Sequence, residues 1–168
     1  HLVFSTLHTN DTIGVIPRLI DLGVEKYLIA PTLNLAVAQR LLRKLCPACK
    51  VKSKPSTAEE NIIKEAIDQM PEELKKGLDK NFSVYKASEE GCAECRGKAF
   101  KGRIAIFEVL EITDDIEKII LSGLSEAALK EAAKNQGMLT MFQDGILKVL
   151  GGVVSLEELL EVAEVGNA

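Results

Sequence analysis

The sequence has no excess of positive charge. Its 168 residues include 21 lysines and arginines against 25 aspartates and glutamates, which gives a formal net charge of −4. Proteins that bind nucleic acid through its phosphates need a concentrated positive surface, so direct nucleic-acid binding is not expected. A local basic cluster could hold a single anionic ligand or form a solvated rim. Its members are Arg40, Arg43, Lys44 and Lys50.

Long apolar runs are also missing. No segment approaches the roughly 20 apolar residues that span a bilayer, and no charged start followed by an apolar core marks a signal peptide. We therefore expect a cytoplasmic protein. The composition, with 46% hydrophobic and 27% charged residues, is that of a globular protein. Because an apolar run follows His1 at once, we expect the chain to be a fragment of a longer protein.

The sequence also lacks a phosphate-binding loop. Such a loop reads G-x-x-x-x-G-K-[ST] after a strand. The nearest approach runs from Gly91 to Gly97, Lys98 and Ala99. It has one residue too many and lacks the hydroxyl that would hold magnesium. Its glycines are better explained by the cysteines that lie between them.

The hydrophobic pattern predicts an α/β chain that starts with a strand. Leu2–Phe4 are apolar and residues 5–11 are mostly polar, as where a buried strand leaves a sheet through a loop. A helix is predicted over 12–22, with Thr9 or Asp11 as its cap.

Further elements follow along the chain. A second helix is predicted at 25–33 and a strand from Leu35 toward Cys46, and the polar residues 50–55 indicate a module boundary. Thr57 and Glu60 form a predicted capping box for the next helix. The remaining predicted elements are a short helix from Pro71, strands at 82–85 and 102–112 that could pair, and helices at 114–121, 125–135, 140–150 and 155–163.

The four cysteines form two Cys-x-x-Cys pairs, Cys46 with Cys49 and Cys92 with Cys95. Four thiolates at this spacing suit a tetrahedral zinc ion with every position filled, which is a structural and not a catalytic metal. The long loop between the pairs costs only about 0.7 kcal/mol more than a usual one, whereas structural zinc contributes on the order of 10 kcal/mol. Two disulfides or thiol redox chemistry are the alternatives.

His8 lies where the first predicted strand meets its polar loop. Ligand-facing residues of α/β sheets gather at such strand ends. The alternative for His8 is a capping or packing role. For His1 such a role is favoured even more strongly.

Segments along the whole chain resemble one known family. HLVFSTLHTND, RLIDLGVEKYLIA, AQRLLRKLCPACK and GCAECRGKAFKGRIAIFEVLEI occur in this order, and the tail SEAALKEAAKNQGMLTMFQDGILKVLGGVVSLEELLEV follows. Together they resemble the carboxy-terminal part of the type II secretion and type IV pilus assembly ATPases, starting at the histidine box of that family.

The resemblance implies an α/β fold in three segments. Residues 1–45 would form the edge of a RecA-like ATPase sheet, 46–102 a four-cysteine zinc-binding module, and 103–168 a strand with a carboxy-terminal helical bundle. It also implies that His8, in the histidine box, is catalytic and lies beside the γ-phosphate of ATP as a sensor. Arg103 matches the arginine of the GR motif near the nucleotide, although Ile104 and Ala105 replace the Thr-Gly that often follows it.

The function implied by the resemblance belongs to a longer protein. That protein would be a homo-hexameric motor ATPase, using ATP and Mg, that drives pilin or pseudopilin assembly through an inner-membrane platform protein. It would be cytoplasmic and associate peripherally with the inner membrane through partners. The Walker A loop, aspartate box and Walker B glutamate of the family precede the histidine box, so this chain alone is expected to be inactive. The alternative is a stand-alone zinc-stabilised adaptor without a nucleotide role.

Overall fold

The computed structural model describes residues 1–78 and 82–163, which form two compact units. Unit 1 comprises residues 1–38 and 108–138, and unit 2 comprises residues 39–107 and those from 139 onward. Each unit thus combines two stretches of chain that are far apart in the sequence. The division into three segments, 1–45, 46–102 and 103–168, stays a prediction.

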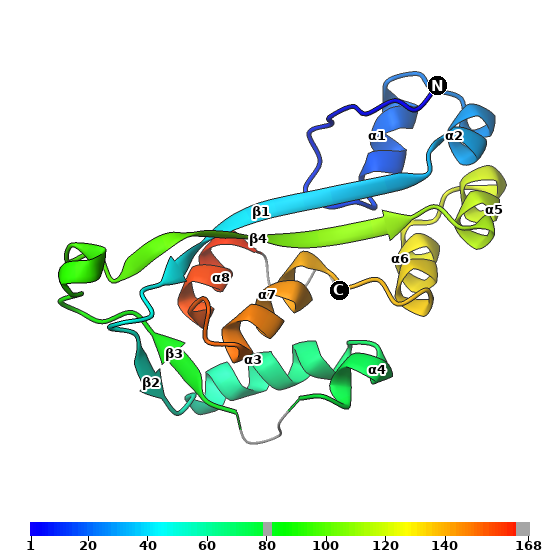
Figure 1. Cartoon of the computed structure of the whole chain (residues 1–168). Helices are drawn as coiled ribbons and strands as arrows, with labels where there is room; N and C mark the ends of the chain where they lie inside the picture. Colours follow the sequence, from blue (N-terminus) through cyan, green and yellow to red (C-terminus); the bar gives the residue numbers. More distant parts are fainter. Residues whose placement is uncertain (79–81, 164–168) are drawn as a thin grey trace. The chain divides into compact units, whose positions relative to one another are not determined.

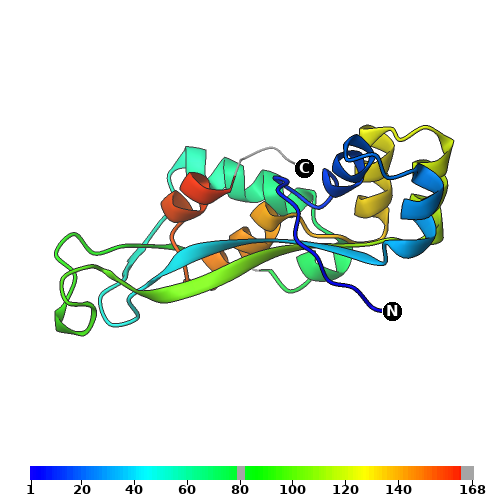
Figure 2. The same cartoon turned by 90° about the horizontal axis from the view of Figure 1, so that it is seen from above.

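Two long strands, β1 (Leu35–Leu45) and β4 (Phe100–Glu111), pair with each other (Figures 1 and 2). They are antiparallel, because Ile112 N donates to Asn34 O (3.0 Å) beyond one end and Cys46 N donates to Ala99 O (2.8 Å) beyond the other. The boundary between the two units falls within both strands. Both strands match the predictions from the sequence.

Unit 1 is built from helices α1 (Val15–Asp21), α2 (Lys26–Thr32), α5 (Asp114–Ser122) and α6 (Glu126–Asn135). Ser125 caps α6, since its side chain accepts a hydrogen bond from Ala128 N. The apolar faces of the helices meet in one core. Its fully buried large side chains are Ile16, Ile29, Leu110, Ile116, Ile120 and Leu129.

The predicted opening strand is wrong. Leu2, Val3 and Phe4 form no strand and are 78–88% exposed. An apolar run becomes a strand only where a neighbouring strand pairs with it, and no strand of the described ranges pairs with this one. The assignment of residues 1–45 to the edge of a RecA-like sheet stays a prediction.

The first helix begins later than predicted. Residues 11–14 form a turn in which Gly14 N donates to Asp11 Oδ1 (2.7 Å), and α1 starts at Val15. Pro17 therefore lies in the first turn of the helix, where its missing N–H group removes no hydrogen bond.

Unit 2 contains a small antiparallel sheet of β2 (Val51–Ser53) and β3 (Val84–Lys86), with Lys52 opposite Tyr85. Its helices are α3 (Thr57–Asp68), α4 (Glu72–Lys75), α7 (Met141–Leu150) and α8 (Leu156–Val162), with a short 3₁₀ turn, η1 (Ala93–Cys95). The predicted pairing of residues 82–85 with 102–112 is wrong, because β3 pairs with β2 and β4 with β1.

Helices α7 and α8 lie between the paired strands and α3, and their apolar side chains belong to the unit 2 core (Figure 1). Carboxylates from these helices also satisfy free N–H groups on the strands. Arg43 N donates to Glu158 Oε1 and Phe107 N to Asp144 Oδ2, both over 2.8 Å. The helical tail predicted from residue 140 onward is confirmed, including its caps, Thr140 and Ser155. The capping box of α3 lies one residue earlier than predicted, at Ser56 and Glu59.

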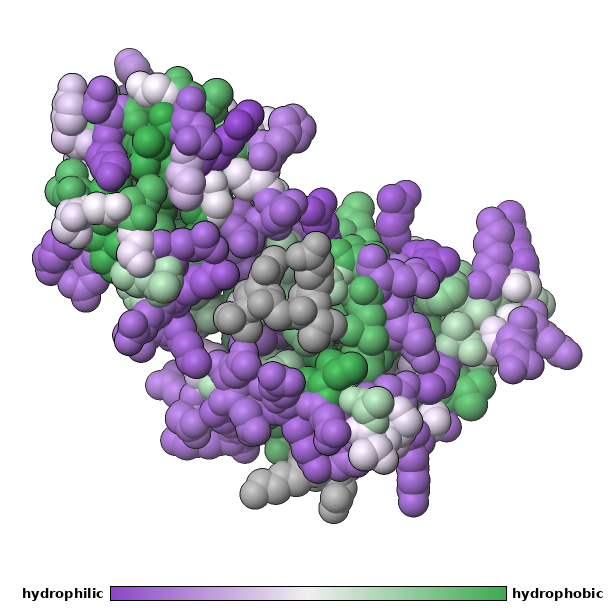
Figure 3. All heavy atoms as spheres, turned by 180° about the vertical axis from the view of Figure 1, so that it is seen from behind, coloured by the Kyte–Doolittle hydropathy of each residue, from purple (hydrophilic) through white to green (hydrophobic). Residues whose placement is uncertain are grey.

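Some apolar side chains remain on the surface, and Figure 3 shows apolar patches between hydrophilic residues on one face. On β1 and β4 the exposed large apolar residues are Leu35, Val37, Leu41, Phe107 and Val109. Within the described ranges, no helix has the length and apolar character needed to cross a membrane.

Candidate functional site

The first cysteine pair lies in a tight turn directly after β1. Cys46 is fixed to the other strand by the bond from its N–H to Ala99 O (2.8 Å). Cys49 N and Lys50 N then both donate to Cys46 O, over 3.3 and 2.9 Å. The turn therefore brings the Cys49 side chain back beside Cys46.

The second pair lies in η1 and the residues that flank it, just before β4. Gly97 N donates to Cys92 O (3.0 Å), which closes the turn. Gly97 has φ +75°, a left-handed conformation that glycine adopts without strain. A Cβ atom added to Gly91 would lie only 2.5 Å from the carbonyl carbon of Gly97. The glycines on either side of the pair thus serve the turn, as the sequence indicated.

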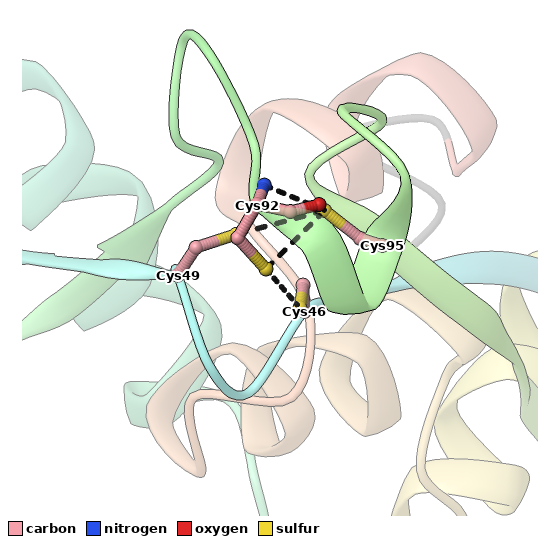
Figure 4. A group of neighbouring side chains, drawn as sticks. All are labelled: Cys46, Cys49, Cys92 and Cys95. Atoms are coloured by element: carbon pink, nitrogen blue, oxygen red, sulfur yellow. Dashed lines mark hydrogen bonds between the residues drawn. The ribbon is translucent and has the colours of Figure 1, made fainter.

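The four sulfur atoms converge on one point (Figure 4). Sγ of Cys46 lies 3.7 Å from that of Cys92, Sγ of Cys49 lies 3.8 Å from that of Cys95, and the Cys92 and Cys95 sulfurs are 3.7 Å apart. All four lie within 4.8 Å of one another. Tetrahedral zinc–thiolate bonds of about 2.3 Å place sulfur atoms about 3.8 Å apart, whereas a disulfide needs about 2.05 Å. The cluster therefore has the dimensions of a four-thiolate metal site.

The surrounding backbone favours a thiolate at Cys95. Burial of the Cys95 sulfur opposes ionisation, but it accepts hydrogen bonds from Cys92 N (3.1 Å) and Ala99 N (3.2 Å), and together with the neighbouring thiols these lower the pKa of Cys95 to about 6. Burial and hydrogen bonds to the other three thiols raise the pKa of Cys49 to about 12. Cys95 thus ionises readily, whereas Cys49 resists ionisation unless a cation balances its charge.

The donor set has no open position, because four protein ligands complete a tetrahedron. A metal ion bound here would cross-link the end of β1 to the start of β4. It would leave no site for water or substrate on the ion. The arrangement is that of a structural metal centre.

Two members of the basic cluster are held by internal contacts. The Arg43 guanidinium lies 4.4 Å from the centre of the Phe100 ring, and its Nε donates to Glu158 Oε2 (2.7 Å). Lys50 Nζ donates to Gly152 O (2.6 Å). For these two residues, the contacts favour a structural role over the anion-binding alternative.

The structure brings the four cysteines together, but among residues 1–78 and 82–163 it gives no hydrogen-bond or ion-pair partner for the side chain of His8 or Arg103. His8 is exposed, in the segment of unit 1 before α1, and Arg103 is exposed on β4 in unit 2. Their roles at a nucleotide stay predictions.

The motif analysis missed a buried polar contact in unit 1. Thr12 and Glu108 are hydrogen-bonded to each other, and both are buried. A signal for it does exist in the sequence. Glu108 follows Ile106 and precedes Leu110 at a spacing of two, which puts a carboxylate on the apolar face of a strand.

Comparisons with known proteins agree over nearly the whole chain. The family model described as "Type II/IV secretion system protein" matches residues 1–161. The chain is 40% identical over 161 residues to the type IV pilus assembly ATPase PilB of Myxococcus xanthus, a match that covers 95% of this chain and 26% of that protein.

Two further relatives give the same result. The PilB of Thermus thermophilus, also a type IV pilus assembly ATPase, is 39% identical, with 95% of this chain and 17% of that protein covered. The type II secretion system ATPase E of Vibrio cholerae is 36% identical, with 98% and 30% covered. The chain thus spans between 17% and 30% of the length of these relatives.

Proposed function

Because this chain belongs to the type II/IV secretion system protein family, we propose that it is the carboxy-terminal part of a hexameric motor ATPase. The motor couples ATP hydrolysis to pilin or pseudopilin assembly, in type IV pilus biogenesis or type II secretion. The observation that carries this proposal is the match over residues 1–161, together with relatives whose names describe ATPases of both systems.

Within the motor, His8 and Arg103 are the residues of this chain that contact ATP. Phosphoryl transfer depends mainly on positioned charge, and both side chains are exposed and available for a ligand. His8 acts as a sensor of the γ-phosphate and Arg103 as a cationic contact. Residues outside this chain hold Mg and the rest of the phosphates, since the chain contains no phosphate-binding loop. The chain by itself is therefore inactive.

The metal at the cysteine cluster is zinc, held by Cys46, Cys49, Cys92 and Cys95. Thiolates are soft ligands, and a closed tetrahedron of four of them suits zinc. It takes no part in the reaction and stabilises the junction of β1 and β4.

The motor works as a homo-hexamer on the cytoplasmic side of the inner membrane, through a platform protein of the secretion or pilus machine. It makes no direct contact with nucleic acid. A stand-alone zinc-stabilised adaptor without a nucleotide role is the competing function, and a complete cysteine cluster is compatible with it.

The deciding experiment measures ATP turnover by the full-length protein that contains this chain. His8→Ala is expected to lower kcat roughly a hundredfold to a thousandfold, the usual effect of losing one transition-state contact. Asp21→Asn, at another exposed position of unit 1, is the control and should leave kcat unchanged. The 168-residue chain alone should show no turnover. Full-length protein that neither binds nor hydrolyses ATP would favour the adaptor.

A further inference from the structure

Glu108 is a buried carboxylate that neither the metal centre nor the proposed nucleotide contacts use. It lies on β4 and is 4% exposed, on the same face as Leu110, which is fully buried. A carboxylate taken out of water is costly unless hydrogen bonds replace its hydration. The position therefore depends on the groups that donate to it.

Thr12 supplies two of these hydrogen bonds. Its backbone N–H and its hydroxyl both donate to Glu108 Oε1, over 2.9 and 2.6 Å. Two donors on one oxygen replace part of the hydration that the buried carboxyl group loses. Both residues belong to unit 1, although they are 96 positions apart in the sequence. The contact thus ties β4 to the segment before α1.

Thr12, which forms these hydrogen bonds, lies only four residues after His8 in the sequence. One longer contact also leaves the turn, from Thr12 Oγ1 to Met138 Sδ (3.8 Å). The bonds of Thr9 and Asp11 are local: Thr9 Oγ1 donates to Asp11 O (2.9 Å), and Gly14 N donates to Asp11 Oδ1 (2.7 Å). Bonds between near neighbours shape a turn but do not place it against the rest of the unit. The two short hydrogen bonds from Thr12 to Glu108 place it more firmly than the long contact to the Met138 sulfur.

We propose that Glu108 is a positioning residue for His8. By holding Thr12, it fixes the backbone from which the exposed His8 side chain reaches the nucleotide, and so the inference rests on the proposed role of His8. A merely structural carboxylate would affect stability whether or not His8 is present. A positioning residue affects kcat only while His8 is there to be positioned.

The test compares Glu108→Ala with Glu108→Gln in the full-length ATPase, each with and without His8→Ala. Gln keeps an oxygen that can accept both bonds from Thr12, so Glu108→Gln should retain most of kcat. Glu108→Ala should lower kcat at least tenfold and change KM for ATP less than threefold. With His8→Ala already present, the same change should lower kcat less than twofold.

A second readout does not depend on turnover. Deuterium exchange of the segment spanning residues 8–14 should be faster in Glu108→Ala than in Glu108→Gln. Should Glu108→Ala fail to fold, Thr12→Val removes one of the two bonds while keeping the side-chain shape, and it should lower kcat at least threefold only while His8 is present.

Equal losses of kcat with and without His8, or equal kcat for Glu108→Ala and Glu108→Gln, would overturn the inference. An unchanged exchange rate of the 8–14 segment in Glu108→Ala would do the same. A His8→Ala variant with full turnover would be a different result, because it refutes the proposed role of His8 itself.

Discussion

The cysteine cluster and the segment around His8 differ in what holds their functional side chains. Each sulfur of the cluster lies within 4.8 Å of the other three, and backbone bonds close both turns that carry them. His8 is exposed and lies four residues before the point where Thr12 is fixed to Glu108. A metal centre is specified by its own ligands, whereas a nucleotide contact is specified by groups that surround the nucleotide. Substitutions should therefore affect stability in the first region and turnover in the second.

The largest effect is expected from loss of the metal. Protein purified without chelator should contain one zinc ion per chain, and Cys95→Ser should abolish binding because the cluster then has three thiolates. Structural zinc contributes on the order of 10 kcal/mol in small domains, so we expect the free energy of unfolding to fall by about 5 kcal/mol or more. Elemental analysis and denaturant unfolding measure the two quantities.

Glu94→Gln is the matched control for the cysteine variant. Glu94 lies between Cys92 and Cys95 in η1, and its ion pair with Lys101 is long (3.4 Å) and exposed. Such a pair contributes little, so metal content and stability should not change. Normal stability of Cys95→Ser, or of wild-type protein stripped by a chelator, would remove the proposed distinction between the two regions.

The next largest loss of stability is expected from a change in the packing of unit 2 that leaves the metal ligands untouched. A Cβ atom at Gly145, inside α7, would lie 2.2 Å from Leu159 Cδ1 on α8. Gly145→Ala should therefore destabilise the protein by about 1–3 kcal/mol through overpacking while leaving the zinc content at one per chain. At Gly77, the nearest atom to an added Cβ is 3.9 Å away, so Gly77→Ala should change stability by less than about 0.5 kcal/mol. Equal urea midpoints for the two variants would contradict this packing.

Local chemistry explains the features that were predictable from the sequence. The Cys-x-x-Cys spacing requires only that each pair occupy a tight turn. The caps at Ser125, Thr140 and Ser155 are set by residues within one turn of each helix start. The four-cysteine site and the helical tail could be predicted because their determinants are close together in sequence.

The start of α1 and the capping box of α3 were misplaced by a few residues, but the larger errors concern neighbours that are distant in sequence. Leu2–Phe4 have the composition of a strand, but composition does not supply a pairing partner. The residues of β3 do not by themselves specify a pairing partner, which in the structure is β2. The bonds from Thr12 to Glu108 and the contact between Gly145 and Leu159 depend on the same long-range placement.

A smaller effect is expected from substitution of Arg103. This variant tests whether an exposed residue of unit 2 can also affect ATP turnover without affecting stability. In the full-length protein, Arg103→Ala should raise KM for ATP about tenfold, equivalent to about 1.4 kcal/mol of binding. It should not change the melting temperature, because the side chain is exposed. Lys101→Ala is the control at an exposed position two residues earlier on β4. The same change in KM for both variants would indicate a general charge effect and not a specific contact.

The smallest effect is expected at the capping box of α3, where a contribution to stability is lost in acid. The Glu59 carboxylate accepts hydrogen bonds from Lys86 Nζ (2.8 Å) and Ser56 N (2.6 Å). These bonds, that of Lys86 above all, lower the pKa of Glu59 from 4.5 to about 2. The unfolded chain therefore takes up the proton first, so the stability that this carboxylate contributes is present above pH 4.5 and is lost as the pH falls toward 2.

Glu59→Gln tests this contribution without altering the metal ligands. Gln keeps an oxygen for Ser56 N but loses the charge beside Lys86. After allowance for solvent screening, we expect the variant to be about 1 kcal/mol less stable at pH 6, with the gap shrinking as the pH approaches 2. Glu157→Gln removes the other, more exposed carboxylate near Lys86 and should change stability by less than about 0.5 kcal/mol. Each variant is compared with wild type at the same pH, so the effect of protonating the cysteine thiols cancels. A stability difference between Glu59→Gln and wild type that stays constant from pH 6 to pH 3 would show that Glu59 does not cause this pH dependence.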